Sequence, residues 1–256
     1  MKRQGVLVCL LAGAVAAAVP AAAQQPTLQL AAPERGVYAV ISDVDLYCSF
    51  VLLEEVPSLR IVASEREGEK ILLSDNDIVY LSQGRSAGLK EGQVFAVLEP
   101  GPAVKSAGVS GIVAFGRGRV RIVRLEDERA HAVIEKGCGQ VEIGDVLAPF
   151  EAKEVTRGKE TPYLLPLRED AATGRFIYME NDLNQIGLGN WGLIDLGKDH
   201  GIQAGQQLAV FNKPAAATPY QAIANIIVIQ AGARSATIRV LSAKDAIRIG
   251  DTVQAK

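Results

Sequence analysis

The decapeptide GLKEGQVFAV at residues 88–97 returns as GIQAGQQLAV at residues 201–210, and five of the ten letters are identical. The identical letters are two glycines, one glutamine and the closing Ala-Val pair. Glycines followed by a short apolar run are typical of a tight turn with positive φ that leads into a β-strand. The polar pair Lys90-Glu91 has become Gln203-Ala204 in the second copy. The decamer therefore indicates a duplicated structural unit rather than a repeated catalytic site.

The duplication extends beyond the decamer in both directions. A shift of 106 residues superposes VEIGDV at 141–146 on IRIGDT at 247–252, and apolar residues alternate in the same way in the segments that precede them. An aspartate in such a Gly-Asp turn accepts hydrogen bonds from the backbone of its own turn. We interpret eight residues as structural turn positions: Gly84, Gly88, Gly92 and Asp145 in the first copy, and Gly197, Gly201, Gly205 and Asp251 in the second.

The pattern of apolar residues predicts an all-β fold. Apolar residues occur in short runs separated by Gly, Asp, Asn and Pro clusters, which is typical of strands, and only Ser49–Val56 is a candidate for a short helix. Short strands with glycine-rich turns favour small closed barrels, which leave few exposed edges. We therefore expect two tandem small β-barrel-like modules related by internal duplication, with an N-terminal cap segment. The expected segments are a signal peptide (1–23), a flexible leader (24–35), the cap (36–69), module 1 (70–150), a linker (151–174) and module 2 (175–256).

The N-terminus predicts export from the cytoplasm. Lys2 and Arg3 precede an apolar run that ends in small residues at Ala21 and Ala23, which is the layout of a cleaved secretory signal. An alternative interpretation makes Cys9 a lipidated cysteine, but Val8 precedes it where a small residue is expected. We therefore expect a periplasmic or extracellular protein with no integral membrane segment after cleavage.

The charge balance of the mature chain argues against a nucleic-acid partner. Losing Lys2 and Arg3 leaves 25 basic side chains against 29 acidic ones, so the basic surface typical of nucleic-acid binders is not expected.

Cys48 and Cys138 form an even pair in a compartment that permits disulfides. A bridge between them would close a loop of about 90 residues and contribute about 4–5 kcal/mol in the chain-entropy model. The alternative is two buried thiols.

Both histidines were considered as catalytic or metal-binding residues. His131 aligns with Thr237 on the outer face of a strand, and His200 aligns with Ala87 in a turn. Neither has a partner at ligand spacing. The acidic clusters at 75–77, 180–182 and 43–45 lack the spacing of a calcium loop and are better explained as turn-forming residues. We therefore assign no catalytic residue, cofactor-binding residue, metal ligand or cofactor.

The stretch GRFIYMENDLNQIGLGNWGLIDLGKDHGIQAGQQLAVF at 174–211, followed by IRIGDTV, resembles the barrel-like region that accompanies LysM modules in bacterial envelope proteins. The segment DLYCSF at 45–50 resembles the leader of such proteins. A weaker similarity is to the C-terminal domain of the flagellar assembly protein T family. The resemblance implies a fold rather than an activity, and the LysM module itself is absent, so glycan binding is not implied.

Two functional classes follow from these observations. The first is an exported, non-catalytic cell-envelope protein that acts as a structural or interaction module, with partners among other envelope proteins or peptidoglycan-associated machinery. The second is a ligand-binding protein or hydrolase with a site in the cleft between the two modules. A pocket with converging polar groups between the modules would favour the second class.

Overall fold

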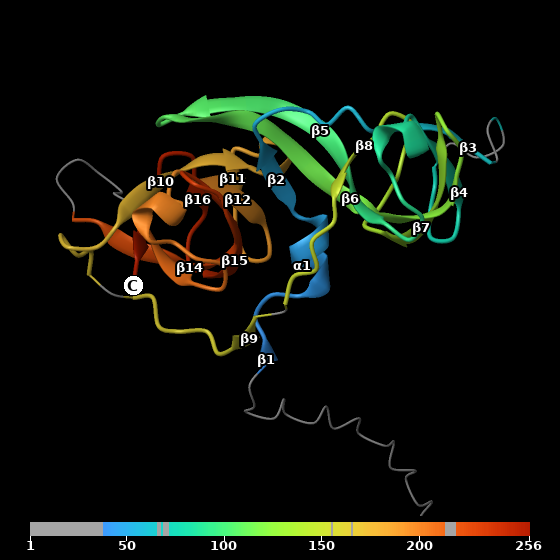
Figure 1. The fold of residues 1–256 in the computed structure, drawn as a ribbon. Helices are drawn as coiled ribbons and strands as arrows, with labels where there is room; N and C mark the ends of the chain where they lie inside the picture. Colours follow the sequence, from blue (N-terminus) through green and yellow to red (C-terminus); the bar gives the residue numbers. More distant parts are fainter. Residues whose placement is uncertain (1–37, 66–67, 69–71, 155, 165, 213–218) are drawn as a thin grey trace, which may run out of the picture. The chain divides into compact units, whose positions relative to one another are not determined.

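The computed structural model describes residues 38–256 except 66–67, 69–71, 155, 165 and 213–218 (Figure 1). The predicted signal peptide and leader lie outside the described residues. The fold is all-β, as predicted, and the only α-helix in the described part is α1 (Asp43–Cys48). None of the helices found among these residues has the length and apolar character needed to cross a membrane.

The first barrel is formed by six strands of a seven-stranded sheet that curls back on itself, and the seventh strand pairs with β6 outside the barrel. Its strand order is β3-β4-β7-β6-β5-β8. The amide of Ile61 donates to the carbonyl of Asp145, and the amide of Leu147 donates to the carbonyl of Leu59, both at 2.9 Å, so β8 returns to β3. The interior is filled with aliphatic side chains. The strands are β3 (Ile61–Ser64), β4 (Ile78–Leu81), β5 (Val94–Ser106), β6 (Val109–Leu125), β7 (Ala130–Gly137) and β8 (Val146–Pro149).

The second barrel has the same strand order and is fully closed. Its order is β10-β12-β15-β14-β13-β17, with β17 returning to β10. Aliphatic side chains together with Phe176 and Met179 fill its interior. A two-stranded pair, β11 (Gln185–Ile186) and β16 (Ile247–Arg248), lies beside it. The barrel strands are β10 (Thr173–Met179), β12 (Trp191–Ile194), β13 (Gln207–Asn212), β14 (Gln221–Ala231), β15 (Ala236–Ala243) and β17 (Thr252–Ala255).

The two barrels match at the level of register, as expected for an internal duplication. Leu81 pairs with Ala130 in the first barrel, and the equivalent residues Ile194 and Ala236 pair in the second. Bulges insert an extra residue and sharpen local twist, so their positions are a sensitive test of equivalence. Register shifts follow Val97, Arg119 and Ile122 in the first barrel and the equivalent Val210, Asn225 and Val228 in the second.

The cap segment has a different secondary structure from that expected. The prediction of a helix over Ser49–Val56 was wrong. The helix ends at Cys48, and Phe50–Leu53 forms strand β2, which pairs with β6. The helix begins earlier because Ser42 caps it, since the Ser42 hydroxyl accepts the Asp45 amide and the Asp45 carboxylate accepts the Ser42 amide. Residues 50–53 are β-prone and gain a ladder with β6. Cys48 forms a disulfide with Cys138, as predicted.

The first barrel extends beyond the shared module at one hairpin. Strands β5 and β6 continue well past the length of their counterparts β13 and β14, and this extension carries β2 along its edge (Figure 1). Val104 near the tip packs with Tyr178 and Leu193 of the second barrel. The hairpin therefore joins the cap and the two barrels through apolar packing.

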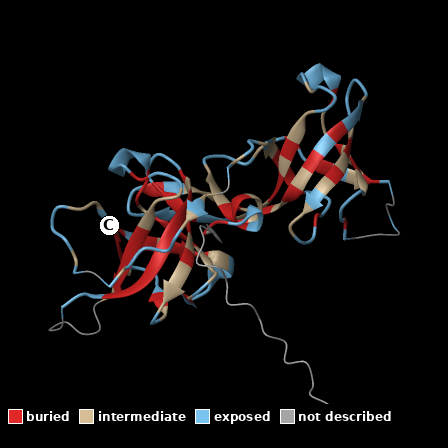
Figure 2. Cartoon of the chain, turned by 90° about the horizontal axis from the view of Figure 1, so that it is seen from below, coloured by how far each residue is buried: buried red, intermediate tan, exposed pale blue. Residues whose placement is uncertain are grey.

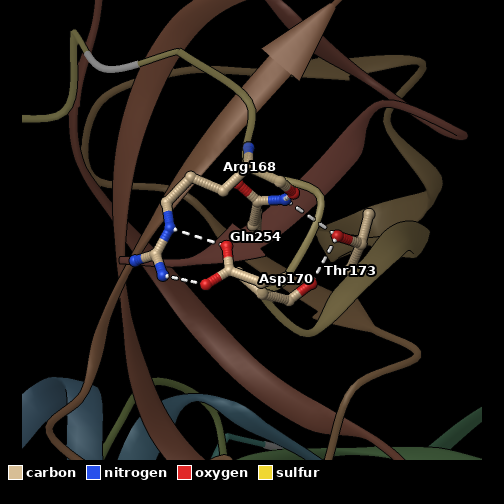
Figure 3. A network of polar contacts seen from close by, with 5 residues as sticks. Arg168, Asp170, Thr173 and Gln254 are labelled. Atoms are coloured by element: carbon tan, nitrogen blue, oxygen red, sulfur yellow. Dashed lines mark hydrogen bonds and ion pairs between the residues drawn. The ribbon is translucent and has the colours of Figure 1, made fainter.

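The boundaries between segments differ in detail from the expected ones. Strand β3 lies before residue 70, within the expected cap, and belongs to the first barrel. The linker 151–174 follows the surface of the second barrel and contributes β9 (Arg157–Gly158), which pairs with β1 (Tyr38–Ala39). Near its end, the Arg168 amide donates to Gln254 Oε1 at 2.7 Å and Gln254 Nε2 donates to the Arg168 carbonyl at 2.6 Å, while Arg168 also pairs with Asp170 (Figure 3).

The turn glycines are required for two different reasons: some face neighbouring backbone atoms too closely for a Cβ, and others have positive φ. This difference leads to a first prediction. A Cβ on Gly84 would lie 2.5 Å from the Arg129 amide nitrogen, whereas Gly88 has φ of 83° but open space around it. We expect Gly84→Ala to lower the free energy of unfolding by about 2–4 kcal/mol, and Gly88→Ala by only about 1–2 kcal/mol.

Chemical denaturation of the purified chain measures both effects. Gly187→Ala is the control, since Gly187 has neither positive φ nor a neighbour within 4 Å, and it should change stability by less than about 0.5 kcal/mol. Equal losses in the Gly84 and Gly88 variants would contradict the distinction between backbone contact and backbone conformation.

Candidate functional site

The eight predicted turn residues lie at equivalent turns of the two barrels. Gly88 and Gly201 have φ of 83° and 77°, and Gly92 and Gly205 have φ of 82° and 83°. The amide of Gly92 donates to the Ile122 carbonyl, and that of Gly205 to the equivalent Val228 carbonyl, both at 2.8 Å. Gly197, like Gly84, faces backbone: a Cβ there would lie 2.5 Å from the Ala233 carbonyl oxygen. These positions build the barrels and do not converge on a common site.

The two turn aspartates make the same hydrogen bond in each copy. Asp145 Oδ2 accepts the Glu142 amide at 2.9 Å, and Asp251 Oδ2 accepts the Arg248 amide at 2.7 Å. Burial raises the pKa of Asp145 to about 6 and also raises the pKa of Asp251. In the buried Asp145 and the partly exposed Asp251, the effect of desolvation on the pKa exceeds that of the backbone hydrogen bond.

Polar groups converge where the cap meets the second barrel. The Asp45 side chain is almost completely buried and accepts four hydrogen bonds. Its donors are the Ser42 amide at 2.8 Å, the Ser42 hydroxyl at 2.6 Å, Trp191 Nε1 at 3.1 Å and Arg239 Nη1 at 2.6 Å. A buried charge is tolerated only when it is paired and hydrogen-bonded. Asp45 therefore fixes α1 to strands β12 and β15.

Apolar contacts surround this ionic contact. Phe50 is fully buried, and its ring packs edge-on against Tyr178 at a centroid distance of 5.4 Å. The Phe50 carbonyl accepts the buried Thr237 hydroxyl at 3.1 Å. Leu46 packs with Ile227 and Ile229 of β14. The cap therefore contacts the second barrel through both buried apolar side chains and buried polar groups.

The outer faces of the two barrels differ because the cap covers only one of them. Strand β14 has eight consecutive buried residues, Ala222–Ile229, since its inner face meets the barrel core and its outer face is covered by the cap and linker. In the first barrel, buried and exposed residues alternate along the strands (Figure 2). Arg121 and Val123, the equivalents of the buried Ile227 and Ile229, are exposed.

A cavity of about 270 Å³ opens where the cap, the first barrel and the start of the linker meet. Its wall is mostly the face of the four-stranded region β8-β5-β6-β2. A second, shallower cavity of about 310 Å³ shares four residues with it. The lining of the first cavity combines apolar side chains with five side chains that carry polar groups: Tyr47, Ser49, Glu151, Lys153 and Gln230 of the second barrel.

Lys153 stands where the two cavities meet. Its Nζ donates to Gln230 Oε1 at 2.6 Å and to the Leu46 carbonyl at 3.3 Å. Its backbone amide and carbonyl both bond the Tyr47 hydroxyl. Burial lowers the pKa of the Lys153 ammonium. Among the described residues no ion pair of Lys153 is found: its Nζ contacts two neutral oxygens, and the charge of the Glu151 carboxylate partly offsets the effect of burial on the pKa.

Neither histidine is among the residues that line this cavity, and both make local contacts. His131 Nε2 lies 2.9 Å from Glu126 Oε1, and its ring packs edge-on against Tyr80 on the outer face of the first barrel. The hydrogen bond from His131 lowers the pKa of Glu126. His200 Nδ1 accepts the Gly197 amide at 3.1 Å and so caps its own turn.

The acidic clusters bind backbone amides. Asp75 accepts the Gly137 amide at 2.6 Å, Asp77 accepts the Ser74 amide at 2.7 Å, and Glu180 accepts the Trp191 amide at 2.9 Å. Among the described residues, no group of three or more His, Cys, Asp or Glu side chains could hold a metal ion. The clusters at 74–77 and 180–182 therefore support turns and strands. The expectation that Asp43 and Asp45 form a turn was wrong, because both lie in helix α1 and Asp45 is buried against Arg239.

Compared with models of known protein families, the chain matches none, and a comparison with curated proteins also finds no match. Arguments about function therefore depend on the site itself.

Sequence reasoning missed Asp45, Arg239 and Lys153. A signal existed for the first: Ser42 followed three residues later by Asp45, just before an apolar run, is the pattern of a helix N-terminus. No comparable signal marked Arg239 or Lys153, because each acquires its partner from a residue more than 70 positions away.

The ionic contact between cap and barrel predicts a large effect on stability. We expect Asp45→Ala to lower the free energy of unfolding by about 3 kcal/mol, because Arg239 loses its buried partner. A double-mutant cycle with Arg239→Ala should give a coupling energy above about 1 kcal/mol. The exposed pair Arg85–Asp127 is the matched control, and its cycle should give less than about 1 kcal/mol. Equal coupling in both cycles would contradict the role of Asp45.

The raised pKa of Asp145 predicts a pH dependence of stability. Because the folded-state pKa is above the unfolded value, the folded state binds more protons, and stability falls as pH rises from about 4 to about 6. Asp145→Asn keeps an acceptor without the charge, so it should be more stable than wild type at pH 7 by about 1–3 kcal/mol. The two proteins should converge near pH 4. Urea unfolding at both pH values measures this difference, and a constant difference would refute it.

Proposed function

We propose that this chain is an exported, non-catalytic protein of the bacterial cell envelope. In this role its two fused β-barrels present their outer surfaces to other envelope proteins or to peptidoglycan-associated machinery. The N-terminal sequence pattern supports export, and the Cys48–Cys138 bridge suits an oxidising compartment.

The observation that carries the proposal is the filling of both barrels. The interior of each barrel is occupied by buried aliphatic side chains, so neither barrel encloses a ligand chamber of the kind found in larger barrels. The cap, the disulfide and the Asp45 contact hold the two barrels together at a cost in buried polar groups. Fixing the position of one barrel relative to the other suits a protein whose outer surface must keep a defined shape.

The exposed face of the first barrel is the favoured partner surface. Arg121 and Val123 lie at positions whose equivalents in the second barrel are covered by the cap. A mixed surface of charged and aliphatic residues is typical of non-obligate interfaces.

Expression in a bacterial host with a periplasm tests the proposal. We expect mass spectrometry to find a mature chain beginning at Gln24, recovered in the periplasmic fraction, with both remaining cysteines oxidised. Photo-crosslinking residues placed at Arg121 and Val123 should capture envelope proteins, and one placed at Leu188, exposed on the second barrel, is the control. An uncleaved chain that stays in the cytoplasm would overturn the proposal.

A ligand-binding role is the second candidate, favoured by the cavity beside Lys153. The apolar wall of that cavity and the ammonium of Lys153 beside it suit the binding of a ligand.

A further inference from the structure

The cavity beside Lys153 has one apolar region and two charged side chains, Lys153 and the exposed Glu151. Val51 and Leu53 of β2, Leu98 of β5 and Ala148 of β8 share one face of the sheet and are only partly covered by the rest of the chain, except for the more deeply buried Leu98. Apolar side chains that line a concave surface favour an apolar ligand. The cap closes this region with Leu46 and Tyr47.

Lys153 determines the charge of a suitable ligand. An ammonium has three N–H donors, and two of them bond Gln230 and Leu46. A half-buried ammonium that has no carboxylate within hydrogen-bond distance gains free energy from an anion placed there. Glu151 lines both cavities and Glu154 lines the second; both are exposed, so water weakens but does not abolish the effect of their charge on Lys153.

We propose that this cavity binds a single-chain anionic amphiphile of the fatty-acid class, with its carboxylate on Lys153 and its alkyl chain against Val51, Leu53 and Leu98. The cavity of about 270 Å³ corresponds to the volume of about nine water molecules. A chain of about eight to ten carbons, whose methylene groups are of similar size, therefore fits. The site lies outside the barrels and goes beyond the proposed envelope role.

Methyl NMR of the purified mature chain tests the proposal, with octanoate as the probe below its micelle concentration. Octanoate should shift the methyl resonances of Val51, Leu53 and Leu98, and it should bind more tightly than 1-octanol or octylammonium. Stronger binding of octylammonium, or no shift of these methyl groups with octanoate, would overturn the proposal. The mature chain is assayed in solution, so the result is independent of where the protein is located.

Substitutions separate the contribution of the octanoate carboxylate to binding from that of its alkyl chain. Lys153→Met should weaken octanoate binding by about tenfold or more, as expected for a lost charge-assisted hydrogen bond, and should change 1-octanol binding by less than about twofold. Lys198→Met is the matched control, because Lys198 lines only the second cavity, and it should leave octanoate binding unchanged.

Two further variants test the site without removing the lysine. Ala96→Phe should fill the cavity and abolish binding of both octanoate and 1-octanol, provided that its melting transition shows a folded protein. Glu151→Gln removes a negative charge from an exposed position and should tighten octanoate binding by about two- to fivefold. Unchanged octanoate affinity in Lys153→Met and in Glu151→Gln would overturn the assignment of the carboxylate to Lys153.

Discussion

The carboxylate of Asp45 is the contact on which the arrangement of the cap depends. It lies in an almost dry environment, where an unpaired charge would cost several kcal/mol. Arg239 and Trp191 of the second barrel, together with Ser42, supply the compensating donors. Three residues further along, Cys48 is bonded covalently to Cys138 of the first barrel. One short helix therefore joins both barrels, by an ionic contact on one side and a disulfide on the other.

Duplication followed by divergence explains how the cap is accommodated. The inward residues and the turns are equivalent in the two copies, because each barrel must fill the same interior and close the same turns. The outward residues are not equivalent. His131 on the open face of the first barrel corresponds to Thr237, which is buried beneath Phe50 in the second. The outward residues differ at positions where the cap covers the second barrel and the first barrel is exposed to solvent.

The cavity is a consequence of the same arrangement. The β5–β6 hairpin extends beyond its barrel and pairs with β2, which creates a sheet face that neither barrel has by itself. The cap and linker cover that face only in part. Lys153 enters the uncovered space from the linker and is held by Gln230 of the second barrel. Ligand-binding surfaces commonly form in this way, at the junction of elements that each fold for other reasons.

The all-β class, the duplication and its turn residues follow from the sequence, because strand periodicity and turn chemistry are local. The sequence also offered Cys48 and Cys138 as a pair, but it left two buried thiols as the alternative, and the fold brings them within bonding distance. The sequence did not determine β2, which was expected as part of a helix, since four β-prone residues become a strand only when β6 lies beside them. Asp45, Arg239 and Lys153 look like ordinary surface residues in sequence. Only the tertiary structure decided their roles, because burial and charge pairing depend on residues that are distant along the chain.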